Sequence, residues 1–261
     1  MSEVLADRVA VVTAAGSGMG RASAMLFAQE GATVVVVDLA REAAEAVVAE
    51  IEQAGGRAVA ETCDVADVAQ LRGVFERVER TFGVLHVLFN HAGIPGPAGI
   101  EDVPEEEWHR AIDVNMKSAW FGTAFGLPLL KRADGKGSII YTASTSGLVG
   151  STMSPLYAMA KGGIVNFARG VALYAAADGI RANVICPGPI DTPMLPQFFG
   201  RTPEARAKAD ENMPAFMAAA VPMGRAGNPA EIAQAALFLA SDASSFVTGV
   251  PLPVDGGYVA R

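Results

Sequence analysis

The chain has 261 residues, of which 51% are hydrophobic and 18% are charged, so it can bury a large core and is not a disordered chain. Its formal net charge of −8 argues against nucleic acid or an anionic membrane surface as a partner. No stretch reaches the roughly 20 apolar residues that span a bilayer, and the start lacks the features of a secretion signal, so we expect a cytoplasmic protein.

Strand-like and helix-like segments alternate through the first half of the chain. Four consecutive valines, Val34 to Val37, form the apolar run that is typical of a strand buried on both faces. The helical segment after them stops at Gly55 and Gly56, because glycine commonly ends a helix. The predicted elements are strands at residues 8–13, 32–38, 57–62 and 85–90, and helices at 21–30, 41–54 and 67–81.

The second half continues the same alternation. It predicts helices at residues 104–132, 154–177 and 229–239, strands at 138–142, 181–186 and 250–254, and an insert at about 189–223. Strands that alternate with helices imply right-handed crossovers and a parallel sheet. We find no internal repeat, linker or low-complexity tract. The sequence therefore predicts a single α/β domain over residues 1–261, a doubly wound, Rossmann-like parallel sheet of about seven strands with helices on both faces.

Glycines gather between the first predicted strand and the first predicted helix. Residues without a Cβ let the backbone turn sharply and approach a pyrophosphate, and the start of the helix offers free N–H groups to it. Elsewhere such a cluster is an ordinary turn, but this context favours dinucleotide binding. The predicted cofactor-binding residues of this loop are Thr13, Gly16, Ser17, Gly18, Met19 and Gly20.

Asp38 closes the second predicted strand, eighteen residues after Gly20. A carboxylate at this point can accept hydrogen bonds from the ribose hydroxyls and would repel a 2′-phosphate, so it favours NAD over NADP. The same aspartate can also cap the next helix, and the two roles are compatible. Leu39 follows it, Asp64 and Val65 are expected beside the adenine, and Asn90, Ala92 and Gly93 are expected on the floor of the crevice.

Tyr157 and Lys161 stand four residues apart on a predicted helix, with Ser144 thirteen residues before the tyrosine. Positions i and i+4 share a helix face, so the phenol and the ammonium can point into one pocket. A nearby cation favours the phenolate and lowers the pKa of a tyrosine from its usual value near ~10. The serine hydroxyl can then hold the substrate oxygen. Taken alone, this pattern is more often a solvated helix face.

The order of these motifs resembles the short-chain dehydrogenase/reductase family over essentially the whole chain. Thr13 to Gly20 resembles the family's glycine motif, Asn90 to Gly93 its strand-four motif, and Pro253 to Gly257 its typical close. The resemblance implies that Asn115, Ser144, Tyr157 and Lys161 are catalytic. It also implies that Tyr157 and Lys161 contact the cofactor, as do Pro187, Gly188, Ile190 and Thr192 near the nicotinamide.

Two positions depart from the family pattern. Ala14 replaces the first motif glycine, and we expect Gly16 to leave the loop flexible enough to bind the cofactor. His91 replaces the second asparagine of the strand-four motif, and we expect it to pack beside the cofactor. Neither of the other two histidines, His86 and His109, has metal-ligand spacing to it, so no metal site is predicted. Cys63 and Cys186 are expected to be buried free thiols rather than a disulfide.

The substrate is expected to contact Ser144, Tyr157 and Met194, together with residues 147–153 and the insert. The insert is either an apolar lid over a hydrophobic or cyclic alcohol, or a segment that merely packs onto the domain. The sequence does not decide between these two interpretations. The apolar residues concerned are Met194, Leu195, Phe198, Phe199, Met213, Phe216 and Met217.

The expected function is an NAD-dependent oxidoreductase that interconverts a secondary alcohol and a ketone, with Tyr157 as acid/base and a small molecule as substrate. One alternative is an NADPH-dependent 3-oxoacyl-carrier-protein reductase, which Asp38 and the acidic balance oppose. Another is a dinucleotide-binding sensor or scaffold without turnover, which would be expected to lose some of the four catalytic residues.

A homotetramer is also expected, because two predicted helices are apolar on more than one face and family members pair these helices. The residues concerned are Trp120, Phe121, Phe125 and Leu129 on one helix, and Ile164, Phe167, Val171 and Tyr174 on the other.

Overall fold

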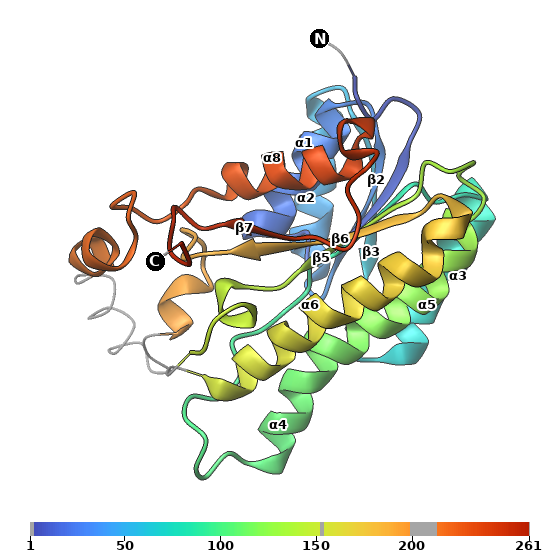
Figure 1. The fold of residues 1–261 in the computed structure, drawn as a ribbon. Helices are drawn as coiled ribbons and strands as arrows, with labels where there is room; N and C mark the ends of the chain where they lie inside the picture. Colours follow the sequence, from blue (N-terminus) through green and yellow to red (C-terminus); the bar gives the residue numbers. More distant parts are fainter. Residues whose placement is uncertain (1–2, 152–153, 199–212, 261) are drawn as a thin grey trace.

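The computed structural model describes residues 3–151, 154–198 and 213–260, and the strands in these ranges form one parallel sheet (Figure 1). Their order is β3-β2-β1-β4-β5-β6-β7, so the chain starts in the middle and winds outward in both directions. The strands are β1 (Val9–Thr13), β2 (Thr33–Asp38), β3 (Arg57–Thr62), β4 (Val87–Asn90), β5 (Ser138–Thr142), β6 (Arg181–Pro187) and β7 (Pro251–Val254). The predicted doubly wound α/β fold is confirmed.

Helices cover both faces of the sheet, as Figure 1 shows. One layer contains α1 (Gly18–Gln29), α2 (Arg41–Gln53) and α8 (Pro229–Ala240), and the other contains α3 (Val68–Phe82), α5 (Ser118–Leu130) and α6 (Pro155–Ala175). Each layer buries its own hydrophobic cluster against the sheet. The valines of β2 point alternately into the two clusters, which explains why this strand is apolar throughout.

Polar caps fix where several helices begin. The Asp67 side chain accepts hydrogen bonds from the first N–H groups of α3, and Gly83 ends that helix with a φ of 71°. Ser154 caps α6, the helix that carries Tyr157, and Pro155 follows at its first position. These caps are local features of the sequence, so the predicted helix ends lie close to the observed ones.

The helix predicted over residues 104–132 is interrupted. It consists of α4 (Glu105–Ile112), a π-helical turn (Asp113–Lys117) and α5. Asn115 lies in the turn, where its Nδ2 donates to the carbonyl oxygens of Ala111 at 2.9 Å and Ile94 at 3.0 Å. A side chain that binds the backbone of its own helix and of another loop disturbs the regular helix ladder. The turn therefore ties Asn115 to the loop that follows β4.

The apolar faces of α5 and α6 are only partly covered. Of the residues on these apolar faces, Leu129, Ile164 and Val171 pack inside the core. Trp120 is 57% exposed and stacks on Phe167 with ring centroids 5.2 Å apart. Leu173 and Tyr174, further along α6, are also exposed. The outer surface of α5 and α6 therefore contains exposed apolar side chains.

Both cysteines, Cys63 and Cys186, are buried free thiols, as predicted. Among the helices of the described ranges, none is both long and apolar enough to cross a membrane.

Candidate active site

The glycine loop joins β1 to α1 at the carboxyl edge of the sheet. The helix begins at Gly18, earlier than residue 21, so the last two motif glycines lie in its first turn. A Cβ at Gly20 would lie only 2.1 Å from the carbonyl oxygen of Ala14. A Cβ at Gly16 would lie 2.8 Å from the Asp38 carboxylate. Neighbouring atoms therefore leave no space for a side chain at Gly16 or Gly20. The loop ends at the start of α1, where the first backbone N–H groups of a helix have no partner within the helix.

Ala14, the departure from the motif, has a φ of 52°. This left-handed conformation costs an alanine roughly 1–2 kcal/mol relative to glycine. The chain therefore keeps the loop geometry of the motif while it carries a mildly strained residue at this position.

Asp38 lies against the glycine loop. Its Oδ2 accepts a hydrogen bond from the Gly16 N–H at 2.8 Å, and its Oδ1 accepts one from the Ala40 N–H at 3.0 Å. The carboxylate is therefore oriented by two backbone donors before any ligand is considered. Leu39, the next residue, is 61% exposed.

Two predicted cofactor residues have side chains that lie behind the crevice. The Thr13 hydroxyl accepts hydrogen bonds from the His91 and Ala92 N–H groups at 2.9 and 3.0 Å, which ties the end of β1 to the turn after β4. The Asn90 Nδ2 donates to Thr123 on α5 at 3.4 Å. Because side chains alternate across a strand, these two residues hold the edge of the sheet rather than line the cavity.

Beyond β3, Asp64 forms an ion pair with Arg110 of α4, whose Nη1 lies 2.9 Å from the Asp64 Oδ2. Val65 packs partly against the core. Asp64 was predicted as a cofactor-binding residue, whereas Arg110 was not predicted, because an ion pair between segments distant in sequence leaves no local signal.

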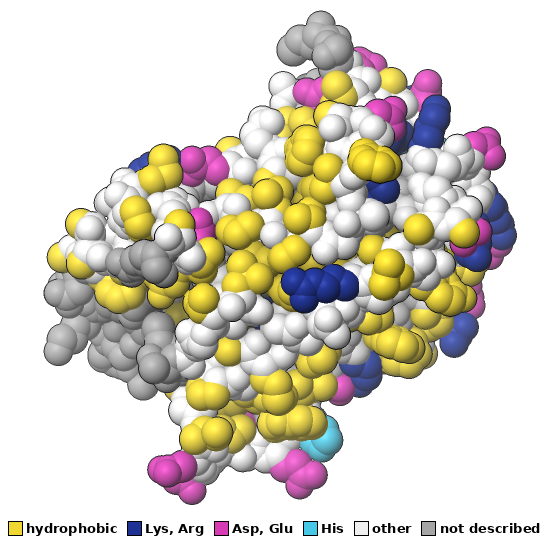
Figure 2. All heavy atoms as spheres, viewed as in Figure 1, with side chains coloured by type: hydrophobic (Ala, Val, Ile, Leu, Met, Phe, Trp, Pro, Cys, Tyr) yellow, Lys and Arg dark blue, Asp and Glu magenta, His cyan; other side chains and the backbone are white. Residues whose placement is uncertain are grey.

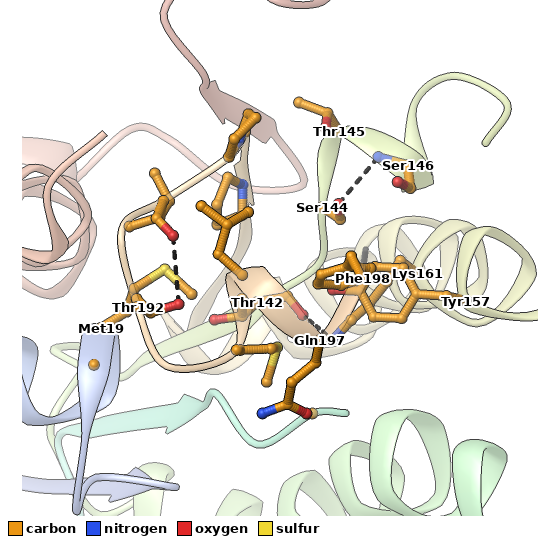
Figure 3. Close-up of a pocket in the computed structure, with 18 of the residues that line it drawn as sticks. Met19, Thr142, Ser144, Thr145, Ser146, Tyr157, Lys161, Thr192, Gln197 and Phe198 are labelled. Carbon is orange, nitrogen blue, oxygen red and sulfur yellow. Dashed lines mark hydrogen bonds between the residues drawn. The ribbon is translucent and has the colours of Figure 1, made fainter. Parts of the chain in front are cut away.

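Ser144, Tyr157 and Lys161 converge on one cavity of about 310 Å³ at the carboxyl edge of the sheet (Figure 3). The Lys161 Nζ donates to the Thr142 carbonyl at 2.9 Å, and Lys161 is only 2% exposed. The Ser144 Oγ accepts from the Ser146 N–H at 3.1 Å. The helical spacing thus brings phenol and ammonium into one pocket, as the sequence predicted.

The pKa of Tyr157 differs from the expectation that the nearby Lys161 lowers it. Burial raises the pKa of the Tyr157 phenol well above its usual range, and a hydrogen bond with Ser144 opposes this by lowering it. Burial also lowers the pKa of Lys161 to about 8. The pKa of Tyr157 is therefore shifted by burial in the direction opposite to the lowering that was expected from Lys161. A phenolate needs further positive charge in the cavity.

Asn115 lies beside Lys161, deep under the loop after β4. Its Oδ1 accepts from the Ile94 N–H at 3.2 Å. A Cβ at Gly93 would lie 2.8 Å from the Asn115 Oδ1 and 2.9 Å from the Lys161 Nζ. The glycine therefore lets the amide and the ammonium approach the same point.

The segment after β6 forms the opposite wall. Phe198, in the 3-10 helix Leu195–Phe198, has its ring centroid 5.3 Å from that of Tyr157. Met217 is buried, so the insert both lines the cavity and packs onto the fold. Phe199 and residues 152–153 lie outside the described residues. The predicted residues that line the cavity from this segment are Pro187, Gly188, Ile190, Thr192, Met194, Leu195, Phe198 and Phe216.

The cavity is also lined by residues that were not predicted, namely Thr142, Ala143, Thr145, Ser146, Gln197 and Tyr258. Tyr258 follows the last strand, and only the return of the chain to the sheet edge brings it there. Within the described ranges, no group of three His, Cys, Asp or Glu residues has an arrangement that could hold a metal ion.

His91 lines the cavity and its Nδ1 lies 2.8 Å from the Thr142 hydroxyl. Burial, and secondarily the Lys161 charge, lowers the pKa of His91 from 6.5 to about 3. Between these two values the unfolded chain binds a proton that the folded chain does not, so the free energy of unfolding falls as the pH is lowered through this window.

His91→Asn should therefore lose less stability than the unmodified protein when the pH is lowered from about 7 to about 5. Denaturant unfolding at both pH values measures this difference. His109→Asn, at an exposed histidine, is the control and should follow the unmodified protein. An equal acid loss in His91→Asn would contradict the prediction.

The chain is similar to known proteins over nearly its whole length. The family model described as enoyl-(acyl carrier protein) reductase matches residues 13–259. The cyclohexanol dehydrogenase of Acinetobacter sp. (strain SE19) is 39% identical over 262 residues, which cover 100% of this chain and 98% of that protein. The cis-4-hydroxycyclohexanecarboxylate dehydrogenase of Sinomonas cyclohexanicum is 40% identical, with 100% of both chains covered.

Among solved structures, a protein from Beutenbergia cavernae described as an NAD(P)-dependent gluconate 5-dehydrogenase superimposes with a TM-score of 0.88 and 35% identity over 100% of both chains. That structure contains NADP at low occupancy. Because the family model and these relatives span nearly the whole chain, the resemblance seen in the sequence is confirmed. The chain belongs to the short-chain dehydrogenase/reductase family.

Proposed function

We propose that the protein is an NAD-dependent oxidoreductase that interconverts a secondary alcohol and the corresponding ketone. One observation carries the proposal: Ser144, Tyr157 and Lys161 face the same cavity as Gly18 and Met19 of the glycine loop. Acid/base groups and a dinucleotide loop on one cavity are what hydride transfer to or from an alcohol carbon requires. The buried free thiols support a reducing, cytoplasmic location.

The cavity edge fits a dinucleotide. The glycine loop has no room for a Cβ at Gly16 or Gly20, so the backbone itself can approach a pyrophosphate. Asp38 would accept hydrogen bonds from the adenosine ribose, and Lys161 would hold the other ribose. When bound, NAD⁺ supplies the hydride acceptor for the substrate carbon.

The chain's own residues hold the substrate and move its proton. The Ser144 hydroxyl hydrogen-bonds both the Ser146 N–H and the Tyr157 phenol, so a substrate oxygen beside Tyr157 would also lie within its reach. Tyr157 as phenolate removes the hydroxyl proton. Lys161 is largely cationic at neutral pH with a pKa of about 8, and its charge favours the phenolate. Asn115 acts through a water molecule that it would hold, and that water would carry the proton onward from Lys161 toward solvent.

The substrate class follows from the wall opposite Tyr157. Met194, Leu195 and Phe198 make that wall apolar, which suits a hydrophobic or cyclic alcohol. The names of the two relatives both refer to alcohols on a cyclohexane ring, which supports this choice.

A panel of cyclic and open-chain secondary alcohols with NAD⁺ and NADP⁺, followed by the absorbance of the reduced nicotinamide, tests the proposal. Turnover of cyclic alcohols with NAD⁺ is expected. Activity only on 3-oxoacyl thioesters with NADPH would favour the carrier-protein reductase. Dinucleotide binding without turnover of any alcohol or ketone would favour a sensor or scaffold.

Cofactor choice gives a separate prediction. The purified protein should bind NAD at least about tenfold more tightly than NADP, because Asp38 would repel a 2′-phosphate. Asp38→Ser combined with Leu39→Arg should reverse the preference, since it replaces a carboxylate with a cation. Calorimetric titration of both dinucleotides measures the ratio. Comparable affinities for the unmodified protein would overturn the assignment of Asp38.

We also propose that the protein forms a homotetramer, in which the outer surfaces of α5 and α6 pair across one two-fold axis and the resulting dimers pair again through the C-terminal strand β7. Trp120, Leu173 and Tyr174 are 57%, 84% and 72% exposed. Figure 2 shows hydrophobic side chains over the region where Figure 1 places these helices. Such a surface is self-complementary across a two-fold axis.

Light scattering should therefore return a mass above that of one 26.9 kDa chain. Leu173→Glu should lower the mass, because it would bury a charge in each copy of the interface. A stable monomer at micromolar concentration would contradict the proposed assembly.

A further inference from the structure

His91, which replaces the second asparagine of the strand-four motif, is held firmly at the wall of the cavity. Its backbone N–H donates to the Thr13 hydroxyl at 2.9 Å. Its ring centroid lies 5.1 Å from that of Phe89 on β4. Its Cδ2 atom lies 2.9 Å from the point that a Cβ at Gly20 would occupy. The imidazole is therefore fixed by its own backbone, by the strand before it and by the start of α1.

The imidazole is linked to Lys161 through one residue, Thr142, at the end of β5. The His91 Nδ1 shares a hydrogen bond with the Thr142 hydroxyl at 2.8 Å. The Lys161 Nζ donates to the carbonyl oxygen of the same threonine at 2.9 Å (Figure 3). Burial and the Lys161 charge lower the pKa of His91 to about 3, so the imidazole is neutral near pH 7. It therefore supplies an oriented hydrogen bond near the ammonium and no competing charge.

The end of β5 has a strand partner on one side only. Its pairing with β6 continues to Thr142, which lies opposite Ile185. Its pairing with β4 stops one residue earlier, at Tyr141 opposite Asn90. On the β4 side, the hydrogen bond from the Thr142 hydroxyl to His91 therefore takes the place of a further strand pair.

We propose that His91 is a positioning residue for Lys161: it holds the Thr142 hydroxyl and thereby fixes the carbonyl oxygen that orients the ammonium. This inference rests on the proposed function, in which the Lys161 charge favours the Tyr157 phenolate. A hydrogen bond to the ammonium raises the pKa of a lysine, because it stabilises the charged form. Loss of the bond between His91 and Thr142 should loosen the carbonyl, lower the protonated fraction of Lys161 and weaken its support for the phenolate.

Few other groups can titrate near Lys161. Within the described ranges, the titratable side chains that line the cavity are His91, Tyr157, Lys161 and Tyr258, and no carboxylate is among them. The buried Cys186 thiol of β6 lies close enough to Lys161 to affect its pKa. Burial raises the pKa of Cys186 to about 12, so this thiol and the His91 imidazole both stay neutral while Lys161 titrates near its pKa of about 8.

Two variants break the same hydrogen bond from its two ends. Thr142→Val removes the hydroxyl, keeps the carbonyl and changes the shape little, whereas His91→Leu removes the imidazole. His91→Asn has nearly the shape of leucine but ends in an amide that can keep the bond. Thr123→Val is the matched control, since this buried threonine bonds the Tyr141 hydroxyl at 2.7 Å on the opposite face of β5.

NMR of protein that is isotope-labelled at its lysines follows the titration of Lys161, and Lys161→Met assigns the signal. The midpoint should fall by about half a pH unit or more in Thr142→Val and in His91→Leu. The double variant should show no larger fall, because both changes remove one bond. His91→Asn and Thr123→Val should keep the midpoint of the unmodified protein.

Alcohol oxidation gives a second measurement on the same variants. In Thr142→Val and His91→Leu, the pH at which NAD-dependent oxidation reaches half its maximum should rise, because the Tyr157 phenolate loses support. His91→Asn and Thr123→Val should keep the pH profile of the unmodified protein.

An unchanged Lys161 midpoint in Thr142→Val would overturn the proposal, even if His91→Leu did not fold. An equal fall in Thr123→Val would do the same, because any loosening of β5 would then be enough. If alcohols were oxidised and the midpoints did not move, this inference alone would fail. If the midpoints moved as expected but no alcohol were oxidised, the proposed function would fail while the link from His91 to Lys161 stood.

Discussion

Tyr157→Phe should reduce turnover by about a thousandfold or more while dinucleotide affinity stays within about twofold. The change removes only the hydroxyl that exchanges a proton with the substrate, and the ring can keep its contact with Phe198. The phenol is buried, and among the described residues no carboxylate lines the cavity to replace it. Steady-state kinetics and calorimetric titration of NAD measure the two quantities separately.

Tyr141→Phe is the matched control. Tyr141 is also a buried tyrosine, and its hydroxyl lies 2.7 Å from the Thr123 Oγ1, outside the cavity. This change should cost about 1 kcal/mol of stability and leave turnover nearly unchanged. If Tyr157→Phe kept more than a few per cent of activity, the acid/base would have to be another residue.

Gly20→Ala should weaken dinucleotide binding by at least about tenfold and destabilise the fold by about 2 kcal/mol. The added methyl group would lie 2.1 Å from the Ala14 carbonyl oxygen and 2.9 Å from the His91 ring. The first of these atoms belongs to the backbone, so the loop itself must move. Thermal unfolding with and without NAD measures both effects, since a ligand that binds the folded state raises the Tm.

Gly73→Ala provides the comparison for this prediction. Gly73 lies inside α3, where an added methyl group would meet only the far end of the flexible Arg77 side chain, at 3.1 Å. This variant should be as stable as the unmodified protein or more stable by up to about 1 kcal/mol, because alanine favours a helix. If NAD raised the Tm of Gly20→Ala and Gly73→Ala equally, the clash at Gly20 would not weaken dinucleotide binding, and the prediction would be wrong.

Local signals were enough to predict most of the fold. The apolar run of β2 and the caps at Asp67 and Ser154 are short-range features, so the order and type of the elements followed from them. The helix over residues 104–132 is the exception. Its π-helical turn depends on hydrogen bonds between Asn115 and Ile94, which lie 21 residues apart, and no periodicity reveals such a contact.

The sequence by itself determined the doubly wound sheet, the glycine loop and the helical pairing of Tyr157 with Lys161, because each depends on spacing within one or two neighbouring elements. Only the tertiary structure decided that Thr13 and Asn90 face away from the cavity, that Tyr258 lines it, and that Arg110 pairs with Asp64. It also decided the electrostatics. Burial shifts the pKa of Tyr157 upward and that of Lys161 down to about 8, and burial is a sum of contacts from segments distant in sequence.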